Sequence, residues 1–303
     1  MTLSCETSSV VRGCIVVTGA STGIGAASAR ELARRGFHVL AGVRRDRDAD
    51  ALRGPGVEPV ILDITRTDHI AELAAHVGSQ SGPLRALVNN AGIAVNAPVE
   101  AMPLDEWRRL FEVNLFGHVA VTQALLPALL RDSGRVINIS SVGGKVAMAT
   151  YGAYAGTKFA LEAVSDSLRR ELTPLGVQVV VVEPGGVRTE MGERVTATTN
   201  RLAAAMSPEQ RDRYGSLVQA ITAQSTAGTS GGRPAEDVAQ VIAKAVTAGK
   251  PRTRYTVGRD AALITRLARV LPDRVLDRIL AAGLRPHHPK TPPHEADVRA
   301  SSG

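Results

Sequence analysis

Tyr154 and Lys158 lie four positions apart in the segment YAGTK, and Ser141 precedes the tyrosine by thirteen positions. On a helix, positions i and i+4 share one face, so the ammonium would lie beside the phenol. An unperturbed phenol titrates near about 10. An ammonium about 4 Å away, at an effective dielectric constant of about 20, favours the phenolate by roughly 4 kcal/mol, or about three pKa units. The spacing therefore predicts a tyrosine pKa of about 7, suited to acid or base catalysis.

A pair of this kind is more often an ordinary surface Tyr and Lys, so the interpretation depends on the start of the chain. Residues 13–25 read GCIVVTGASTGIG, an apolar β-branched run followed by Gly19, Gly23 and Gly25 and then by a helical pattern. Strand, glycine-rich turn and helix, in that order, are the context of a dinucleotide fingerprint. Glycines allow close approach to a pyrophosphate, and the helix N-terminus supplies amide donors. A purely structural turn is the alternative.

The ordered set of motifs resembles the short-chain dehydrogenase/reductase superfamily over about residues 12–260. The similarity to its steroid and retinol dehydrogenase-like branch comes from AGVRR after the second expected strand and KFALE after the tyrosine. The motifs are TGASTGIG (18–25), Asp63, NNAG (89–92), Asn114, Ser141, Tyr154, Lys158 and PGGVRT (184–189).

Apolar, β-rich stretches alternate with segments of helical periodicity, which predicts an α/β fold with right-handed crossovers and a parallel sheet. The resemblance implies a single doubly wound Rossmann-type domain, a seven-stranded parallel sheet with helices on both faces and strand order 3-2-1-4-5-6-7. Ligands bind such sheets beyond the carboxyl ends of the strands, where Thr18, Asp63, Asn89, Ser141 and Pro184 are expected. The expected strands are 14–18, 38–43, 59–62, 85–89, 135–140, 177–183 and a seventh near 255–257.

By resemblance, Tyr154 is the general acid when a ketone is reduced and the general base when an alcohol is oxidised. Ser141 would polarise the carbonyl oxygen. Lys158 would hold the nicotinamide ribose, and Asn114 would hold a water that connects Lys158 to solvent. Ser140 and Tyr151 are neighbouring residues of the same types, and their positions distinguish them from Ser141 and Tyr154. Ser140 points away from Ser141 if the strand end alternates, and Tyr151 has Ala155 rather than a cation four positions later, so it is either a pocket wall or a structural aromatic.

The same resemblance implies cofactor contacts spread along the motifs. Asp63 would accept from the adenine amino group, Asn90 with Gly92 would shape the adenosine wall, and Thr189 with the backbone of Val187 would bind the carboxamide. The expected cofactor-binding residues are Gly19, Ser21, Thr22, Gly23, Ile24, Gly25, Arg44, Asp63, Ile64, Asn90, Ala91, Gly92, Tyr154, Lys158, Pro184, Gly185, Val187 and Thr189.

The end of the second strand predicts the choice of cofactor. The position at which NAD-specific relatives carry an acidic residue is Val43, followed by Arg44 and Arg45. A carboxylate there would bond the ribose 2′-hydroxyl, whereas an arginine pairs with a 2′-phosphate. We therefore expect NADP to be preferred, with NAD as the alternative, through Arg44, while Arg45 points to solvent.

These features predict an NADP(H)-dependent oxidoreductase that interconverts a hydrophobic carbonyl compound and its secondary alcohol by hydride transfer. The alternatives are an NAD-dependent alcohol dehydrogenase of steroid or retinol type and a non-catalytic dinucleotide-binding regulator. The intact Ser141, Tyr154 and Lys158 argue against the regulator. The residues expected to line an apolar substrate pocket, by fold analogy, are Ala94, Val95, Ala147 and Met148.

The length and composition of the chain restrict the other functional classes that it could belong to. With 303 residues and 44% hydrophobic content, the chain can bury the core of one domain. The net charge of +7 comes with scattered arginines and 3% aromatics, which favours a solvated surface over a nucleic-acid site. Cys5 and Cys14 form no disulfide framework, and Cys14 is expected in the core. We found no apolar run of spanning length and no signal peptide in the sequence, and we expect a cytoplasmic protein, a homodimer or a homotetramer without a metal.

The chain divides into four expected regions: a flexible N-terminus (1–11), the Rossmann domain (12–258), a helical extension (259–285) and a disordered tail (286–303). Within the domain, 190–233 is rich in small polar residues. The family resemblance implies a mobile substrate lid there, and a variable surface loop is the alternative. Residues 260–282 predict two amphipathic helices broken at Pro272, packed over the cleft or on another subunit, or else in peripheral contact with a membrane. The histidines of the tail, His287, His288 and His294, lack a scaffold for a metal.

Overall fold

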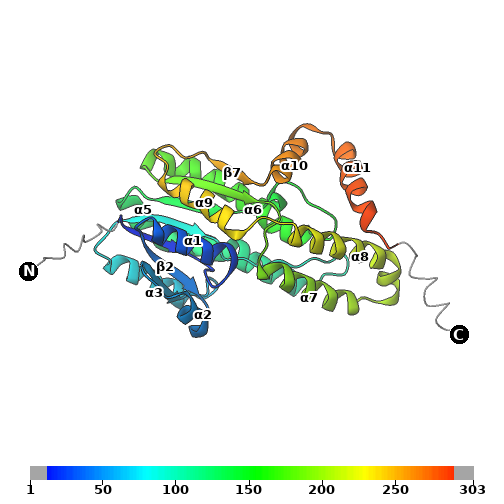
Figure 1. Ribbon diagram of the computed structural model, residues 1–303, viewed down its shortest axis with the longest axis horizontal. Coiled ribbons are helices and arrows are strands. Elements are labelled where there is room, and N and C mark those ends of the chain that lie inside the picture. Colours follow the sequence, from blue (N-terminus) through cyan, green and yellow to red (C-terminus); the bar gives the residue numbers. More distant parts are fainter. Residues whose placement is uncertain (1–11, 290–303) are drawn as a thin grey trace, which may run out of the picture.

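The computed structural model describes residues 12–289 of the chain. Its centre is one sheet of seven parallel strands in the order β3-β2-β1-β4-β5-β6-β7 (Figure 1). This confirms the predicted fold class and strand order. The strands are β1 (Cys14–Val17), β2 (His38–Val43), β3 (Val57–Ile61), β4 (Leu84–Asn89), β5 (Arg135–Ile139), β6 (Gln178–Pro184) and β7 (Arg254–Val257).

Strand β3 begins two residues before the predicted stretch 59–62 and, like that stretch, contains Pro59. Proline cannot donate to a ladder, so within a sheet it is confined to edge strands and strand ends. Strand β3 is an edge strand that pairs only with β2, and Pro59 lies opposite Ala41. Pro59 would be unfavourable in a central strand, but it is compatible with an edge strand.

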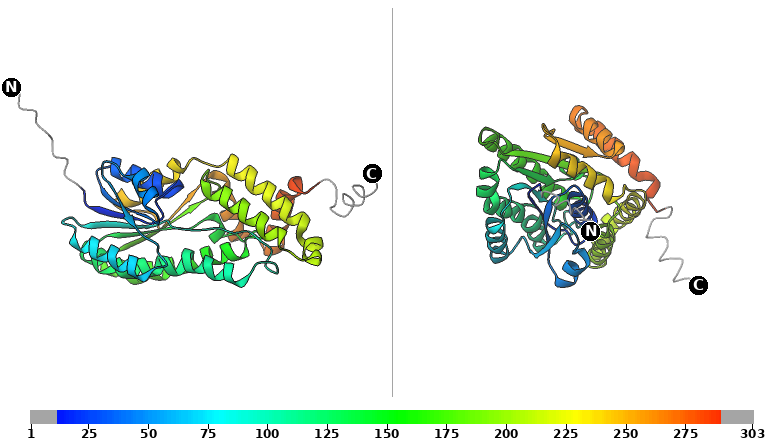
Figure 2. Two further views of the ribbon diagram at one scale, coloured as in Figure 1. Left: turned by 90° about the horizontal axis from the view of Figure 1, so that it is seen from below. Right: turned by 60° about the vertical axis from the view of Figure 1, so that its left-hand side comes forward.

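Helices cover both faces of the sheet, as the view from below shows (Figure 2). The helical segments are α1 (Gly23–Arg34), α2 (Asp46–Leu52), α3 (Thr67–Ser79), α4 (Leu104–Phe111), the π-helical η1 (Glu112–Phe116), α5 (Gly117–Arg131), η2 (Val142–Gly144), α6 (Gly152–Leu172), η3 (Thr173–Leu175), α7 (Glu190–Ala204), α8 (Pro208–Ser230), α9 (Ala235–Thr247), α10 (Arg259–Val270), α11 (Asp273–Leu284) and η4 (Arg285–His287).

Alternation along the strands gives the sheet two separate cores. Ile15 and Val17 of β1 pack with α1 and α9, whose buried residues include Leu32 and Ile242. Cys14 and Val16 point to the other face, with α3, α5 and the end of α6. Cys14 is buried in this core, which confirms the prediction of a core cysteine, and burial raises the pKa of its thiol to about 12. Because aromatic residues are few, Val, Leu, Ile and Ala fill both cores.

The segments α4, η1 and α5 form one continuous helix, Leu104–Arg131, of 28 residues that is long and apolar enough to cross a membrane. The expectation that no segment of the chain meets this criterion was wrong. The helix packs on the sheet, however, with Leu110, Val121 and Leu125 buried. A covering helix of an α/β core is apolar for this reason, and this one carries charged residues in its first two turns.

The segment expected to be a lid consists of two helices, α7 and α8, with few loop residues. They gather with α10 and α11 at one end of the sheet (Figure 1). The turn between α7 and α8 contains a capping box that the sequence carries as SPEQ. Ser207 Oγ accepts from Gln210 N at 3.2 Å, and Gln210 Oε1 accepts from Ser207 N at 3.1 Å. Such reciprocal caps mark the start of a helix.

Helices α10 and α11 confirm the predicted pair broken at Pro272, the residue that precedes α11. Leu284, at the end of α11, is buried with Ile221 of α8. Leu263 and Val270 stay exposed. In residues 12–289, no group of His, Cys, Asp or Glu could hold a metal ion. The predictions for 1–11, for His294 and for most of the tail lie outside the described residues, but η4 extends into the predicted tail as far as His287.

Candidate active site

The turn between β1 and α1 is shaped by glycines at positions where a side chain would not fit. Gly19 and Gly23 have φ values of 64° and 56°, in the left-handed region that favours glycine. A Cβ on Gly25 would lie 2.3 Å from the Gly19 carbonyl oxygen and 2.5 Å from Asn90 Nδ2. Asn90 Nδ2 donates to the carbonyl oxygens of Thr18 and Gly19, at 2.9 and 3.0 Å. The Asn90 side chain thus fixes the glycine turn, a contact that differs from the adenosine wall expected of it.

The helix start beyond this turn fits a pyrophosphate. The first turn of α1 carries no acidic residue, and Thr22, which precedes it, makes no side-chain capping bond within the described chain. The first backbone amides of a helix lack intrahelical acceptors, so these donors, with Ser21 and Ile24 beside them, are available to an anion. Thr189 approaches the same turn, since its Cγ2 would lie 2.9 Å from a Cβ on Gly23.

Asp63 and Arg44 lie together beyond the ends of β3 and β2. Asp63 Oδ1 accepts from the backbone and hydroxyl of Thr65, at 3.0 and 2.8 Å. Burial raises the pKa of Asp63, but these hydrogen bonds, with the charges of Arg44 and His69, bring it below its ordinary value. Ile64, which follows, is buried. The carboxylate is therefore ionised at neutral pH, and its oxygens can accept from an amino group.

Both arginines after β2 are exposed, and they differ in their ion pairs. The Arg45 guanidinium pairs with Asp48 at 2.7 Å. Arg44 is exposed, and within the described part of the chain no carboxylate lies at ion-pair distance from it. Val43 is 1% exposed and packs in the core. An aspartate at Val43 would therefore start in an apolar site, so a variant of Arg44 alone is the cleaner probe of cofactor choice.

The two serines after β5 have different environments, as alternation predicts. The Ser140 side chain is buried against Gly144. Ser141 is half-buried, its Oγ accepts from the Gly143 amide at 3.0 Å, and its hydroxyl is hydrogen-bonded with that of Tyr154. The fold therefore brings Ser141, and not Ser140, to the tyrosine.

Helix α6 carries both Tyr154 and Lys158 on one face. The Lys158 ammonium lies 5.9 Å from the centroid of the Tyr154 ring and donates to the carbonyl oxygen of Ile139 at 2.9 Å. Tyr151 packs edge-on against Tyr154, with ring centroids 6.5 Å apart, and on its other side it contacts the cluster of Ile221 and Leu284. Tyr151 is thus a structural aromatic that connects α6 to α8 and α11.

The electrostatics of this pair differ from the prediction. Burial raises the pKa of Tyr154, and the Ser141 hydrogen bond only partly opposes it. Burial also lowers the pKa of Lys158 to about 8, against the opposing charge of Glu162. The predicted tyrosine pKa of about 7 was wrong, because the ammonium bonds the Ile139 carbonyl instead of approaching the phenol and because desolvation acts on both groups.

Asn114 lies in the π-helical turn η1, which interrupts the long helix beside Lys158. Its amide brackets the backbone of Ile93: Nδ2 donates to the Ile93 carbonyl at 2.8 Å, and Oδ1 accepts from the Ile93 amide at 2.9 Å. A Cβ on Gly92 would lie 3.5 Å from Asn114 Oδ1 and 4.0 Å from Lys158 Nζ. The glycine thus leaves a small space between these two polar groups.

The loop after β6 closes the site from the other side. Pro184 ends the strand, the Gly185 amide donates to Val257 at 3.0 Å, and Val187 forms an isolated bridge with Arg233 before Thr189 starts α7. Ala91 lies against the glycine turn, since its Cα would lie 2.6 Å from a Cβ on Gly19.

The four residues expected to line the substrate pocket are not equivalent. Val95 is buried in a small cluster with Ala153 and Leu202 of α7, whereas Ala94 and Met148 are partly buried and Ala147 is exposed. Sequence reasoning also missed a buried ion-pair network next to Lys158 that centres on Glu162. The signal was a glutamate one helical turn after the lysine in KFALE.

Comparisons with known proteins agree with this arrangement. The short chain dehydrogenase family matches residues 13–200. Retinol dehydrogenase 7 of Mus musculus is 37% identical over 281 residues, which cover 88% of this chain and 87% of that protein. A short-chain dehydrogenase from Streptomyces avermitilis has a TM-score of 0.70 at 30% identity, over 89% of this chain and 94% of that one.

A short chain dehydrogenase from Burkholderia cenocepacia J2315, solved in complex with NADP, has a TM-score of 0.68 at 27% identity, over 90% of this chain and 97% of that one. The match extends over nearly the whole of both chains. The chain therefore belongs to the short-chain dehydrogenase family, in the branch that resembles retinol and steroid dehydrogenases, and is an NAD(P)-dependent oxidoreductase.

Proposed function

We propose that the protein interconverts a hydrophobic carbonyl compound and its alcohol with NADP(H) as cofactor, and that Tyr154 is the general acid and base. The observation that carries this proposal is the convergence of Ser141, Tyr154 and Lys158 beside the glycine turn. Following NADPH absorbance against a panel of hydrophobic ketones and aldehydes tests it. A carbonyl-dependent loss of absorbance is expected, and its absence across steroid, retinoid and long-chain substrates would count against the assignment.

In the reductive direction, the Ser141 hydroxyl donates a hydrogen bond to the carbonyl oxygen, and Tyr154 transfers its proton to that oxygen. A bound reduced nicotinamide supplies the hydride to the carbonyl carbon. Because burial raises the pKa of Tyr154, the phenol is protonated at neutral pH and ready to donate. Lys158, with its pKa lowered to about 8, is charged below that pH and stabilises the phenolate that remains. Neutral pH therefore favours reduction.

The cofactor contacts follow the same arrangement. Lys158 and Tyr154 would hold the nicotinamide ribose, Thr189 and the Val187 backbone would bind the carboxamide, and Asp63 would accept from the adenine. Support comes from the ionised state of Asp63 and from the approach of Thr189 to Gly23. The role of Asn114 is to fix Ile93 and to border the space next to Lys158, where a water would connect the lysine to solvent.

The preference for NADPH depends on Arg44. A charge-assisted contact with the 2′-phosphate contributes about 1.5 to 3 kcal/mol, or roughly ten- to a hundredfold in affinity. We expect NADPH to bind more tightly than NADH by this factor, and Arg44→Ala to remove the difference. Fluorescence titration of both dissociation constants measures it, with Arg45→Ala as the matched control, since Arg45 is already paired with Asp48. Equal constants in the wild type would favour the NAD-dependent alternative.

We propose that helices α7 and α8 form a substrate lid. Leu202 of α7 packs in a small apolar cluster with Val95, and Ile221 of α8 packs with Leu284. The polar contacts of the two helices with the body include Arg201 with Glu106 at 3.0 Å, Arg213 with Glu100, and the Tyr214 hydroxyl with Glu100 at 2.8 Å. Because exposed pairs contribute little stability and the apolar clusters are small, we expect the helix pair to open locally at lower free energy than the sheet. Trypsin should cleave after arginines of 190–233 in the free protein, and NADPH with a substrate should protect them. Equal cleavage rates would argue against closure.

We also propose a substrate class, a cellular location and an oligomeric state. Val95, with Leu202 of the lid, supports an apolar substrate such as a steroid, a retinoid or a long-chain carbonyl compound. We infer a reducing, cytoplasmic location from the buried thiol of Cys14 and a homodimer or homotetramer from the family. Peripheral membrane contact through 260–282 is the alternative that exposed Leu263 and Val270 favour. Cell fractionation and light scattering measure these properties.

A further inference from the structure

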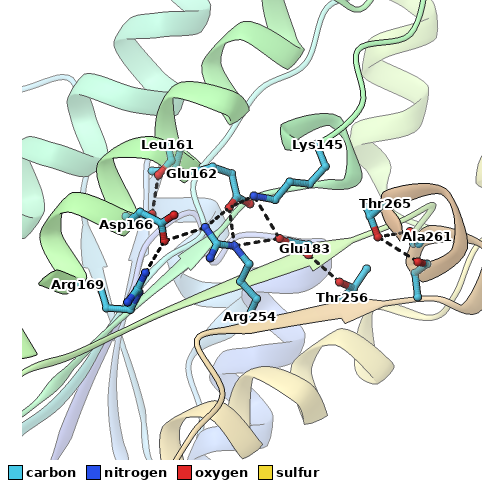
Figure 3. A network of polar contacts seen from close by, with 12 residues as sticks. Lys145, Leu161, Glu162, Asp166, Arg169, Glu183, Arg254, Thr256, Ala261 and Thr265 are labelled. Atoms are coloured by element: carbon cyan, nitrogen blue, oxygen red, sulfur yellow. Dashed lines mark hydrogen bonds and ion pairs between the residues drawn. The ribbon is translucent and has the colours of Figure 1, made fainter. Parts of the chain in front are cut away.

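Glu162 is the centre of a buried ion-pair network that joins four parts of the fold (Figure 3). Its Oε2 accepts from Lys145 Nζ at 2.7 Å and from Arg254 Nε at 3.0 Å. Arg254 of β7 also pairs with Asp166 at 2.9 Å and with Glu183 of β6 at 3.4 Å. The Glu162 side chain is only 5% exposed. A carboxylate buried to this extent stays ionised only when cations compensate its lost hydration.

The network attaches the Ser141 loop to the helix that carries Tyr154. Lys145 directly follows η2, the turn that begins after Ser141, and its partner Glu162 belongs to α6. Gly144 lies so close to α6 that a Cβ there would be 3.1 Å from the Lys158 carbonyl oxygen and 3.1 Å from Glu162 Cγ. Loop and helix are therefore in direct contact at the residue between Ser141 and Lys145.

Glu162 also lies one helical turn from Lys158, on the same face of α6. Lys158 is 4% exposed, and the hydrogen bond to Ile139 is its only one to a described residue. The neighbouring His118 on α5 is buried, and burial and the charge of Lys158 lower its pKa to about 3, so it is neutral. Burial and the neighbouring charge of Glu162 raise the pKa of Glu183.

We propose that Glu162 is a positioning residue that keeps the Lys158 ammonium charged and docks the Ser141 loop through Lys145. Around Lys158, α6 contributes Glu162 and Tyr154, and α5 contributes the neutral His118. The groups that face Glu162 from other elements are Lys145, Glu183 and Arg254. Among these groups, Glu162 is the carboxylate one helical turn from Lys158. Burial lowers the pKa of Lys158, and the negative charge of Glu162 raises it. The positive charges of Lys145 and Arg254 partly neutralise Glu162 and so reduce this increase in the pKa of Lys158.

The sign of the effect can be tested on the free protein. Replacing Glu162 by Gln removes a negative charge and leaves two cations near Lys158, so the lysine should lose its proton at lower pH. Lys145→Met removes a cation and should have the opposite effect. Asp166→Asn is the matched control, because Asp166 shares Arg254 with Glu162 but lies two helical turns from Lys158 and is more exposed. A purely structural role would give no such dependence on charge.

The measurement is the pH titration of the lysine side chains by NMR, with protein that contains [6-¹³C]lysine. The chain has few lysines, Lys145, Lys158, Lys244, Lys250 and Lys290, and Lys158→Met assigns the relevant signal. We expect the Lys158 midpoint to fall by about one pH unit in Glu162→Gln and to rise in Lys145→Met. In Asp166→Asn it should stay within about 0.2 pH unit of the wild type.

An unchanged Lys158 midpoint in Glu162→Gln, or an equal shift in Asp166→Asn, overturns the proposal. If circular dichroism shows that Glu162→Gln does not fold, Lys145→Met and Glu162→Asp replace it as the test. The proposal is contradicted if the Lys158 midpoint falls or stays unchanged in Lys145→Met. It is also contradicted if the Lys158 midpoint in Glu162→Asp, which keeps the negative charge, falls by the full pH unit expected for loss of that charge. This titration needs no substrate, so its failure is distinct from failure of the proposed function, on which the role of Lys158 rests. With a substrate in hand, the alkaline limb of the kcat profile should move to lower pH in Glu162→Gln.

Discussion

Tyr154→Phe should lower kcat for carbonyl reduction by about 10²- to 10⁴-fold, the usual contribution of a general acid. The change removes one hydroxyl and keeps the ring, so packing against Tyr151 and the ring face toward Lys158 are retained. The dissociation constant of NADPH should change by less than about threefold, since the other cofactor contacts are retained. Steady-state kinetics and fluorescence titration measure the two effects separately.

Tyr151→Phe is the matched control for this variant. It removes a phenol from the same helix end, but Tyr151 contacts α8 and α11 rather than Ser141. Its kcat should remain close to that of the wild type. A Tyr154→Phe variant that keeps most of its turnover, or a Tyr151→Phe variant that loses as much, would remove Tyr154 from the role of proton donor.

Lys158→Met should lower both turnover and cofactor affinity. Methionine approximates the length of the buried stem and removes the ammonium, so stability should change less than with alanine. Loss of the charge removes the stabilisation of the phenolate and the contact with the ribose. We expect kcat to fall by about a hundredfold or more and the NADPH dissociation constant to rise by roughly tenfold.

Lys244→Met, on the exposed face of α9, controls for loss of a positive charge at a distance. It should leave both constants unchanged. If Lys158→Met binds NADPH as tightly as the wild type, the ribose contact is wrong. If its turnover is intact, the lysine has no part in proton transfer.

The sheet could be predicted because its strands are short apolar runs bounded by polar residues. The central runs are buried on both faces, whereas the edge strands β3 and β7 are only partly buried. The alternation with helical segments leaves few possible topologies. The glycine turn and the order of Ser141, Tyr154 and Lys158 along the chain similarly required only local spacing. These features depend on neighbours in sequence, which pattern analysis can read.

The helices of the segment 190–233 could not be predicted because their sequence signal is weak. Small residues such as Ala, Thr and Ser give α8 little amphipathic contrast, and composition alone resembled a loop. The stabilising contacts are tertiary: Val218 and Ile221 are buried, and Leu284 comes from more than sixty residues later in the chain. Only the SPEQ capping box was visible locally.

The electrostatic prediction failed for a related reason. Helical spacing placed Lys158 beside Tyr154 correctly, but it could not show that the ammonium bonds the Ile139 carbonyl or that both groups are desolvated. Nor could it show that Glu162 is joined by Arg254, from a strand at the far edge of the sheet. Proton affinities depend on such distant partners, whereas motif spacing does not report them.

Transfer of isotope tests the central claim most directly. The wild-type protein is incubated with NADPH carrying deuterium at C4 of the nicotinamide and with the best hydrophobic carbonyl substrate from the panel, and the alcohol is analysed by mass spectrometry. The account predicts an alcohol with deuterium on the former carbonyl carbon, formed by the wild type and almost absent with Tyr154→Phe. Absence of labelled alcohol with any substrate, or equal labelling by both proteins, would contradict it.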